Sequence, residues 1–140
     1  MTVTDYNKPL PHPSEESQPF WDGCKRRELL VQKCRSCQTL VHYPRSVCPV
    51  DAGTEFDWAP LSGRGEVHSY TVCHRAFHPG FAEDVPYVAA IIELAEGVRM
   101  MSNVIDVDPS KVHIGMPVEV VFEDVTEEIT LPKFRPVAVR

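Results

Sequence analysis

Two short motifs, Cys34-Arg-Ser-Cys37 and Cys48-Pro-Val-Asp51, contain the residues with the clearest chemistry in this sequence. In each motif two residues separate the outer pair, a spacing that lets a tight turn direct both side chains at one metal ion. Two such turns supply four ligands in a tetrahedral array, the closed coordination of structural zinc. Three positions are cysteines, and the fourth, Asp51, offers a harder oxygen ligand that makes a less secure site. We therefore predict a structural zinc on Cys34, Cys37 and Cys48, with Asp51 as the candidate fourth ligand.

The same cysteines leave a redox function open. The chain has five cysteines, an odd number in an uneven pattern that is unlike the disulfide framework of a secreted protein. Its N-terminus lacks the apolar core of a signal peptide, and no apolar run is long enough to span a bilayer, so we expect a cytoplasmic protein without a membrane segment. In the cytosol, paired cysteines bind metals or act as redox thiols. No strand–CxxC–helix pattern surrounds these pairs, which favours the metal, but a stand-alone zinc or redox module remains an alternative.

Length and composition limit the remaining possibilities. The 140 residues, with 43% hydrophobic and 9% aromatic content, suffice for one compact core, either a single domain or a small domain with an appended metal module. The formal net charge is -6 and the isoelectric point is near 5.5. Nucleic acid bound through its phosphates requires a basic face, so this balance argues against a nucleic-acid partner.

The first part of the chain is expected to be an arm, a helix and a metal ribbon. Residues 1–13 contain three prolines among polar residues, which indicates an extended arm. Residues 14–54 are then expected to form a helix, most regular from Gln18 to Leu30, and a rubredoxin-like ribbon with residues 40–45 as its return strand. His42 could be a substitute metal ligand, but we favour a surface strand residue. The helix carries Phe20 and Trp21, a large apolar pair. It can pack on the core of its own domain or dock onto another subunit.

Residues 55–140 show β-strand patterns to the end of the chain. Residues 55–61 alternate apolar and polar side chains, and the long run Glu66–Ala76 alternates so that Val67, Ser69, Thr71 and Cys73 share one face. Five or six strands with one short helical connection are typical of a small Greek-key barrel such as an OB-fold. The predicted class is therefore mainly β: an N-terminal helix and rubredoxin-like zinc ribbon, followed by an OB-fold barrel.

Independent catalysis is not expected. Cys73 and His74 could form a nucleophile and its base, but adjacent strand residues point to opposite faces and cannot make the activating hydrogen bond. No set of base, nucleophile and oxyanion donors assembles from the sequence. We therefore predict that the chain is not itself an enzyme.

A series of motifs in one order carries a family resemblance over nearly the whole chain. They include Phe20-Trp21-Asp-Gly23, the Cys34–Cys37 turn with Leu30-Val-Gln-Lys before it, Tyr43-Pro44-Arg45, Ser62-Gly-Arg-Gly65, Glu96-Gly-Val-Arg99, Ile114-Gly115-Met116-Pro117 and Leu131-Pro132-Lys-Phe134. The sequence resembles the acyl-CoA-associated OB-fold family with an N-terminal rubredoxin-like zinc ribbon. It departs from the family in two respects: Asp51 stands where the family usually has a fourth cysteine, and Cys24 and Cys73 are extra thiols.

The resemblance implies a small, non-catalytic subunit that binds and stabilises a thiolase-like partner and helps to form its acyl-CoA channel. Such partners include acyl-CoA thiolases, hydroxymethylglutaryl-CoA synthase assemblies, steroid side-chain aldolases and polyketide-type acyltransferases. It also implies a heterotetramer with two copies of each chain and acyl-CoA at or near the interface. We expect Phe20 and Trp21 to bind the partner. The loop side expected to border the acyl-CoA channel contains Phe77, His78, Phe81 and Tyr87.

These loop residues also permit a simpler interpretation, an ordinary barrel loop with a few core aromatics. A second OB-fold function, binding of single-stranded nucleic acid, requires aromatics that stack on bases in a positive groove. The acidic balance of the chain weighs against this alternative.

Overall fold

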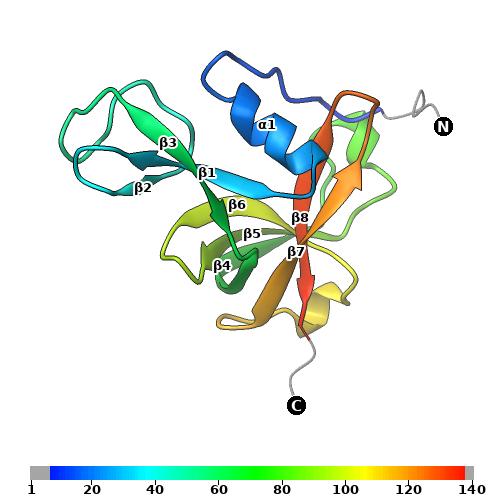
Figure 1. Cartoon of the computed structure of the whole chain (residues 1–140). Helices are drawn as coiled ribbons and strands as arrows, with labels where there is room; N and C mark the ends of the chain where they lie inside the picture. Colours follow the sequence, from blue (N-terminus) through cyan, green and yellow to red (C-terminus); the bar gives the residue numbers. More distant parts are fainter. Residues whose placement is uncertain (1–6, 138–140) are drawn as a thin grey trace.

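Two β-sheets make up most of the structure, a computed structural model that describes residues 7–137. In chain order the elements are α1 (Gln18–Lys25), β1 (Leu29–Cys34), β2 (Leu40–Val41), β3 (Phe56–Leu61), β4 (Arg64–Cys73), η1 (Pro79–Phe81), β5 (Tyr87–Leu94), β6 (Arg99–Val104), η2 (Pro109–Lys111), β7 (Pro117–Asp124) and β8 (Thr130–Pro136). The sheet of β1, β2 and β3 projects from one side of a barrel, and α1 lies in the angle between the two (Figure 1). The mainly β fold predicted from the sequence is confirmed.

The barrel closes in the strand order β4-β5-β6-β8-β7, with β7 returning to β4. All neighbouring strands are antiparallel except β6 and β8, which run parallel and share a single bridge between Val104 and Phe134. Phe134 is 0% exposed and lies in the main hydrophobic core with Val67, Ile92 and Val118. This closed five-strand Greek-key arrangement is an OB-fold barrel, as the strand count predicted.

The strand β3 belongs to the small sheet, whereas we expected residues 55–61 to open the barrel. It pairs with β1 through six residues, from Leu29 opposite Leu61 to Cys34 opposite Phe56. Because β3 is an edge strand, Pro60, which lacks an N–H group, is tolerated there. Alternation along a strand reveals which side chains share a face but not which strand is the neighbour, so the sequence pattern could not decide between the two sheets.

The predicted helix is shorter than expected. It ends at Lys25 instead of Leu30, because Arg27 takes the left-handed conformation with φ 66° and the chain reverses, with the Glu28 N–H donating to the Gly23 carbonyl at 2.8 Å. Glycine is the usual residue at such a turn, so no stop signal is visible at Arg27 in the sequence. The turn has a structural consequence: Arg27 leaves the helix face and contacts the barrel.

A β-bulge at His68 changes the predicted faces of β4. Val67 pairs with Ile92, but Ser69 pairs with Ile91, so two residues of β4 oppose one step of β5. Beyond the bulge Tyr70 takes the face of Val67, and Ser69 points to the opposite side. The expectation that Val67 and Ser69 share a face was therefore wrong, since a single extra residue inverts every later position.

The arm lies against the loop between β4 and β5. A Cβ atom added to Gly80 would lie 2.4 Å from the Asn7 carbonyl oxygen, so only glycine permits this close approach. Lys8 forms an ion pair with Asp84 at 2.8 Å in the same loop. Of the predicted arm, residues 1–6 lie outside the described residues, as do residues 138–140 at the end of the barrel.

Asp124 connects the turn after α1 to the barrel. Its carboxylate accepts two hydrogen bonds from the Arg27 guanidinium, at 2.8 and 2.7 Å, and one from the Thr130 hydroxyl at 2.6 Å. These bonds, those of Arg27 first, hold the pKa of Asp124 well below its usual range. A depressed carboxyl pKa stabilises the fold above the unfolded value of about 3.9, and this contribution is lost as the pH falls below it.

We therefore expect Asp124→Asn to lower the melting temperature at neutral pH, and this difference from the wild type to shrink steadily below about pH 4. Thermal unfolding followed by circular dichroism across the acid range measures it. Arg27→Met should produce the same pH dependence, since it removes the other partner. A melting-temperature difference that stays constant with pH would contradict the assignment to the charged pair.

Candidate metal centre

The two ligand-bearing turns have the same backbone conformation. In the first, the Gln38 N–H donates to the Cys34 carbonyl at 2.8 Å, and in the second, the Ala52 N–H donates to the Cys48 carbonyl at 3.0 Å. Gln38 and Ala52 both have left-handed backbones, with φ 64° and 63°. Asp51 thus occupies the position in the second turn that Cys37 occupies in the first.

The four side chains converge. The ligand atoms of Cys34, Cys37, Cys48 and Asp51 all lie within 4.8 Å of one another. The Sγ atoms of Cys37 and Cys48 are 3.7 Å apart, and Cys34 Sγ lies 3.4 Å from Asp51 Oδ1. Zinc–sulfur bonds of about 2.3 Å place tetrahedral sulfurs about 3.8 Å apart, so the spacing fits the ion. Three thiolates and one carboxylate also form a donor set that zinc accepts, and the cluster is consistent with structural zinc.

Hydrogen bonds from Ser36 and Gly53 orient the side chain of Asp51. Its Oδ1 accepts from the Gly53 N–H at 2.9 Å, and its Oδ2 accepts from the Ser36 hydroxyl. These bonds, that of Ser36 first, keep the pKa of Asp51 below its usual range, so the side chain is a carboxylate at neutral pH. A Cβ on Gly53 would lie 2.7 Å from Ser36 Oγ, which explains a glycine here. Sequence reasoning missed Ser36 and Gly53; the Asp-x-Gly spacing of an Asx turn was the available signal.

A buried glutamine fixes the segment between the two turns. Gln32 in β1 donates from Nε2 to the Arg45 carbonyl at 2.9 Å and accepts from the Arg45 N–H at 2.8 Å. This amide replaces the strand pairing that we expected along residues 40–45, of which only Leu40–Val41 form a strand. His42 follows β2 directly and is half-buried, with its ring centroid 5.2 Å from that of Phe20. Contrary to our expectation, it is therefore neither in a strand nor fully at the surface.

The two residues predicted to bind the partner, Phe20 and Trp21, differ in exposure. Phe20 is 5% exposed and belongs to the main hydrophobic core. Trp21 is half-buried and meets Phe20 edge-to-face, with ring centroids 5.0 Å apart. Of these two aromatics, a partner can therefore reach only the outer face of Trp21.

The four residues predicted to border the acyl-CoA channel have different surroundings. Phe81 and Tyr87 stack with ring centroids 5.4 Å apart and line a cavity of about 490 Å³, together with Lys8 and Lys133. His78 uses its Nδ1 to accept the Gly80 N–H at 2.9 Å, which shapes the turn of η1. Phe77 is 80% exposed and lies under the Arg75 guanidinium at 5.7 Å.

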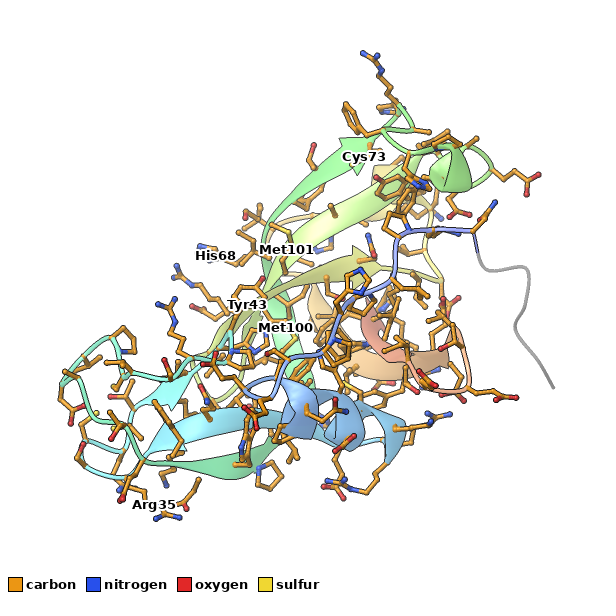
Figure 2. All side chains as sticks on the ribbon, turned by 90° about the horizontal axis from the view of Figure 1, so that it is seen from above. Arg35, Tyr43, His68, Cys73, Met100 and Met101 are labelled. Carbon is orange, nitrogen blue, oxygen red and sulfur yellow. The ribbon has the colours of Figure 1, made fainter. Side chains whose placement is uncertain are left out.

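The two extra thiols have different surroundings. Cys24 is fully buried in α1, and burial raises the pKa of its thiol to about 12, so it is a packing residue. Cys73 ends β4 opposite Tyr87. Figure 2 shows Cys73 at the far end of the β4–β5 pair, well away from Arg35 in the ribbon. The structure therefore brings neither Cys24 nor Cys73 to the metal cluster.

A rubredoxin-like zinc ribbon joined to an OB-fold barrel defines the class of this protein. Residues 21–57 match the family model of the ChsH2 rubredoxin-like zinc ribbon domain, and residues 58–123 match that of the ChsH2 C-terminal OB-fold domain. The chain belongs to this ChsH2, or DUF35, family.

Three similar proteins are described as a scaffold protein, a hydratase subunit and an aldolase. A "DUF35 domain-containing scaffold protein" of Methanocaldococcus jannaschii is 41% identical over 110 residues, 77% of each chain. A "probable enoyl-CoA hydratase alpha subunit" of Thermomonospora curvata is 38% identical over 92% of this chain, which spans only 40% of that relative. A solved chain described as the "Ltp2-ChsH2(DUF35) aldolase" superposes with a TM-score of 0.84 at 37% identity, covering 92% of this chain and 100% of that one.

Within residues 7–137, the helices are too short or too polar for any of them to cross a bilayer.

Proposed function

We propose that the chain is a non-catalytic scaffold subunit that binds a thiolase-like aldolase or a related acyl-CoA enzyme and helps to form its acyl-CoA channel. The observation that carries this proposal is the similarity to the Ltp2-ChsH2(DUF35) aldolase chain over the whole length of that chain. The name of the methanogen relative, a scaffold protein, agrees with it.

The chemistry of the described residues supports a structural function. Four protein ligands converge on the metal position, and a zinc ion with four protein ligands has no open position for a substrate or an activated water. The buried thiol of Cys24, with its raised pKa, is a poor nucleophile. In the proposed complex, the reacting groups belong to the partner chain.

Two exposed features are suited to docking. Phe77 projects from the β4–β5 loop beside Arg75, and aromatic and arginine side chains contribute most to binding at protein interfaces. The half-buried Trp21 presents a second aromatic surface on α1. In this proposal Phe81 in the β4–β5 loop and Tyr87 at the start of β5 border the acyl-CoA channel, and the complex contains two copies of each chain.

Replacing both Trp21 and Phe77 by alanine tests the docking surface. We expect the variant to lose at least about 100-fold in affinity for a thiolase-like aldolase of the same organism, measured by co-purification and by titration of the purified chains. Ile114→Ala is the matched control, since Ile114 is also an exposed apolar residue but lies near η2. Circular dichroism confirms folding of the variants. If the wild-type chain binds no thiolase-like protein, the proposed function fails; if binding survives the double substitution, only the docking residues are wrong.

A second candidate is a scaffold for a hydratase. The T. curvata relative is described as a "probable enoyl-CoA hydratase alpha subunit", and the region similar to this chain accounts for 40% of its length. The same co-purification separates the two candidates, because the recovered catalytic chain is either a thiolase-like or a hydratase protein.

A further inference from the structure

A second cavity lies where the arm, α1, the ribbon and the barrel meet. It has a volume of about 470 Å³, within the usual range for small-molecule sites. Its walls are mainly apolar and come from all four parts of the fold; they include Phe20, Trp21, Tyr43, Met100, Met101 and Leu131. Figure 2 shows Tyr43, Met100 and Met101 gathered on this side, and the Met101 N–H donates to the Tyr43 hydroxyl at 3.2 Å.

The charge of this cavity is opposite to that of the chain. The chain carries a net charge of -6, yet no aspartate or glutamate lines the cavity, and Lys133 is its one lysine or arginine. His42 adds no charge at neutral pH, because burial lowers the pKa of its imidazole to about 4. The lining therefore presents a single fixed cation on an apolar surface, apart from the exposed His12 at the edge of the cavity.

Lys133 is held in place by a neutral group. Its Nζ donates to Asn103 Oδ1 at 2.7 Å, and Asn103 Nδ2 donates to the Val88 carbonyl at 2.9 Å, which fixes the amide with its oxygen toward the lysine. Among the described residues, no ion pair includes Lys133. Burial lowers the pKa of Lys133, and the carboxylates of Glu123 and Asp84, which line the other cavity beside Phe81 and not this one, only partly offset that effect. A half-buried ammonium group that forms no ion pair is stabilised by an anionic ligand.

We propose that this cavity binds a small organic acid with one carboxylate and an aryl or branched alkyl body. The carboxylate accepts hydrogen bonds from Lys133, whose bond to Asn103 leaves two further N–H donors. The apolar body lies between Trp21, Tyr43 and Met101. No part of this argument uses a partner chain, although Trp21 also belongs to the proposed docking surface.

The test compares two probes that share the same apolar body but carry either a carboxylate or a neutral amide. Isothermal titration with 3-phenylpropanoate and with 3-phenylpropanamide is carried out on the full, zinc-containing chain. Hydrogen bonds to charged groups are stronger than neutral ones, so we expect the acid to bind at least about tenfold more tightly than the amide. Lys133→Met should abolish this preference, whereas Lys111→Met, at an exposed lysine in η2, should leave it intact.

Asn103→Asp provides a second variant that retains Lys133. Its carboxylate would accept the same hydrogen bond and neutralise the cation from within the protein, so binding of the acid should fall at least about tenfold. Equal affinity for acid and amide would overturn the proposal and indicate a site for neutral acyl groups. It would also be overturned if neither probe bound at millimolar concentration, or if Lys133→Met and Asn103→Asp, both folded, bound the acid as the wild type does.

Discussion

Replacing Cys48 with serine is expected to remove zinc from the protein and to unfold the ribbon while the barrel stays folded. Cys48 is buried, and its Sγ lies 3.7 Å from that of Cys37. The ribbon has a hydrophobic cluster with only three buried members, Cys34, Val41 and Cys48, two of which are ligands. A segment with so small a core depends on metal binding for much of its folding free energy. The barrel has a much larger core, which also includes Leu29 and Val31 of β1.

Elemental analysis and circular dichroism measure this result. We expect about one zinc per wild-type chain and less than roughly a tenth of that in Cys48→Ser. Cys73→Ser is the matched control, because it makes the same chemical change at a thiol outside the metal cluster. A Cys48→Ser chain that retains its zinc would contradict the ligand assignment.

The fourth ligand position, Asp51, can be tested by replacing its carboxylate with a stronger ligand and by removing it. Asp51→Cys should strengthen zinc retention against a chelator, because thiolate is a softer ligand than carboxylate and the turn already has the geometry of the Cys34–Cys37 turn. Asp51→Ala should weaken retention by at least about tenfold. If Asp51→Ala holds zinc as firmly as the wild type, the three cysteines suffice and Asp51 is not a ligand.

Phe134→Ala is expected to destabilise the barrel by about 3–5 kcal/mol, the usual cost of truncating a fully buried phenylalanine. Phe134 is 0% exposed and forms the single bridge between β6 and β8, where its carbonyl accepts the Ile105 N–H at 2.7 Å. The cavity left behind would lie at the weakest junction of the barrel. Since domains are stable by about 5–15 kcal/mol in total, the loss is a large fraction of the whole.

Urea denaturation of the zinc-loaded protein provides the measurement. Phe77→Ala removes the same side chain from a position that is 80% exposed and should change the free energy of unfolding by less than about 0.5 kcal/mol. Equal effects of the two substitutions would show that the junction of β6 and β8 does not depend on Phe134.

Local patterns in the sequence predicted a good part of the fold and the site. Ligand spacing alone predicted the cluster of Cys34, Cys37, Cys48 and Asp51, because a turn of fixed length brings residues three apart together. The barrel followed from strand count and turn positions. The errors came where a local rule had more than one solution: Arg27 ended the helix without a glycine, and the bulge at His68 inverted a face without interrupting the apolar pattern.

Other features depend on contacts between distant parts of the chain. Trp21 and Phe20 are neighbours in sequence, yet only the packing of α1 against the barrel decides that Phe20 is buried and Trp21 partly exposed. Gln32 reaches Arg45, and Asn103 positions Lys133, through side-chain bonds that span 13 and 30 residues. No periodicity marks such pairs in the sequence.

The sequence by itself therefore predicted the cluster of three cysteines and Asp51, the mainly β class and the family resemblance, since each of these depends on residue types at short and regular spacing. Tertiary structure alone decided that β3 joins the ribbon, which aromatics are exposed, and that Lys133 lies between an apolar cavity without a carboxylate and a second cavity lined in part by Asp84 and Glu123. These features depend on which surfaces meet when the chain closes on itself. That outcome is set by the burial of apolar area across the whole molecule, to which each local segment contributes only a part.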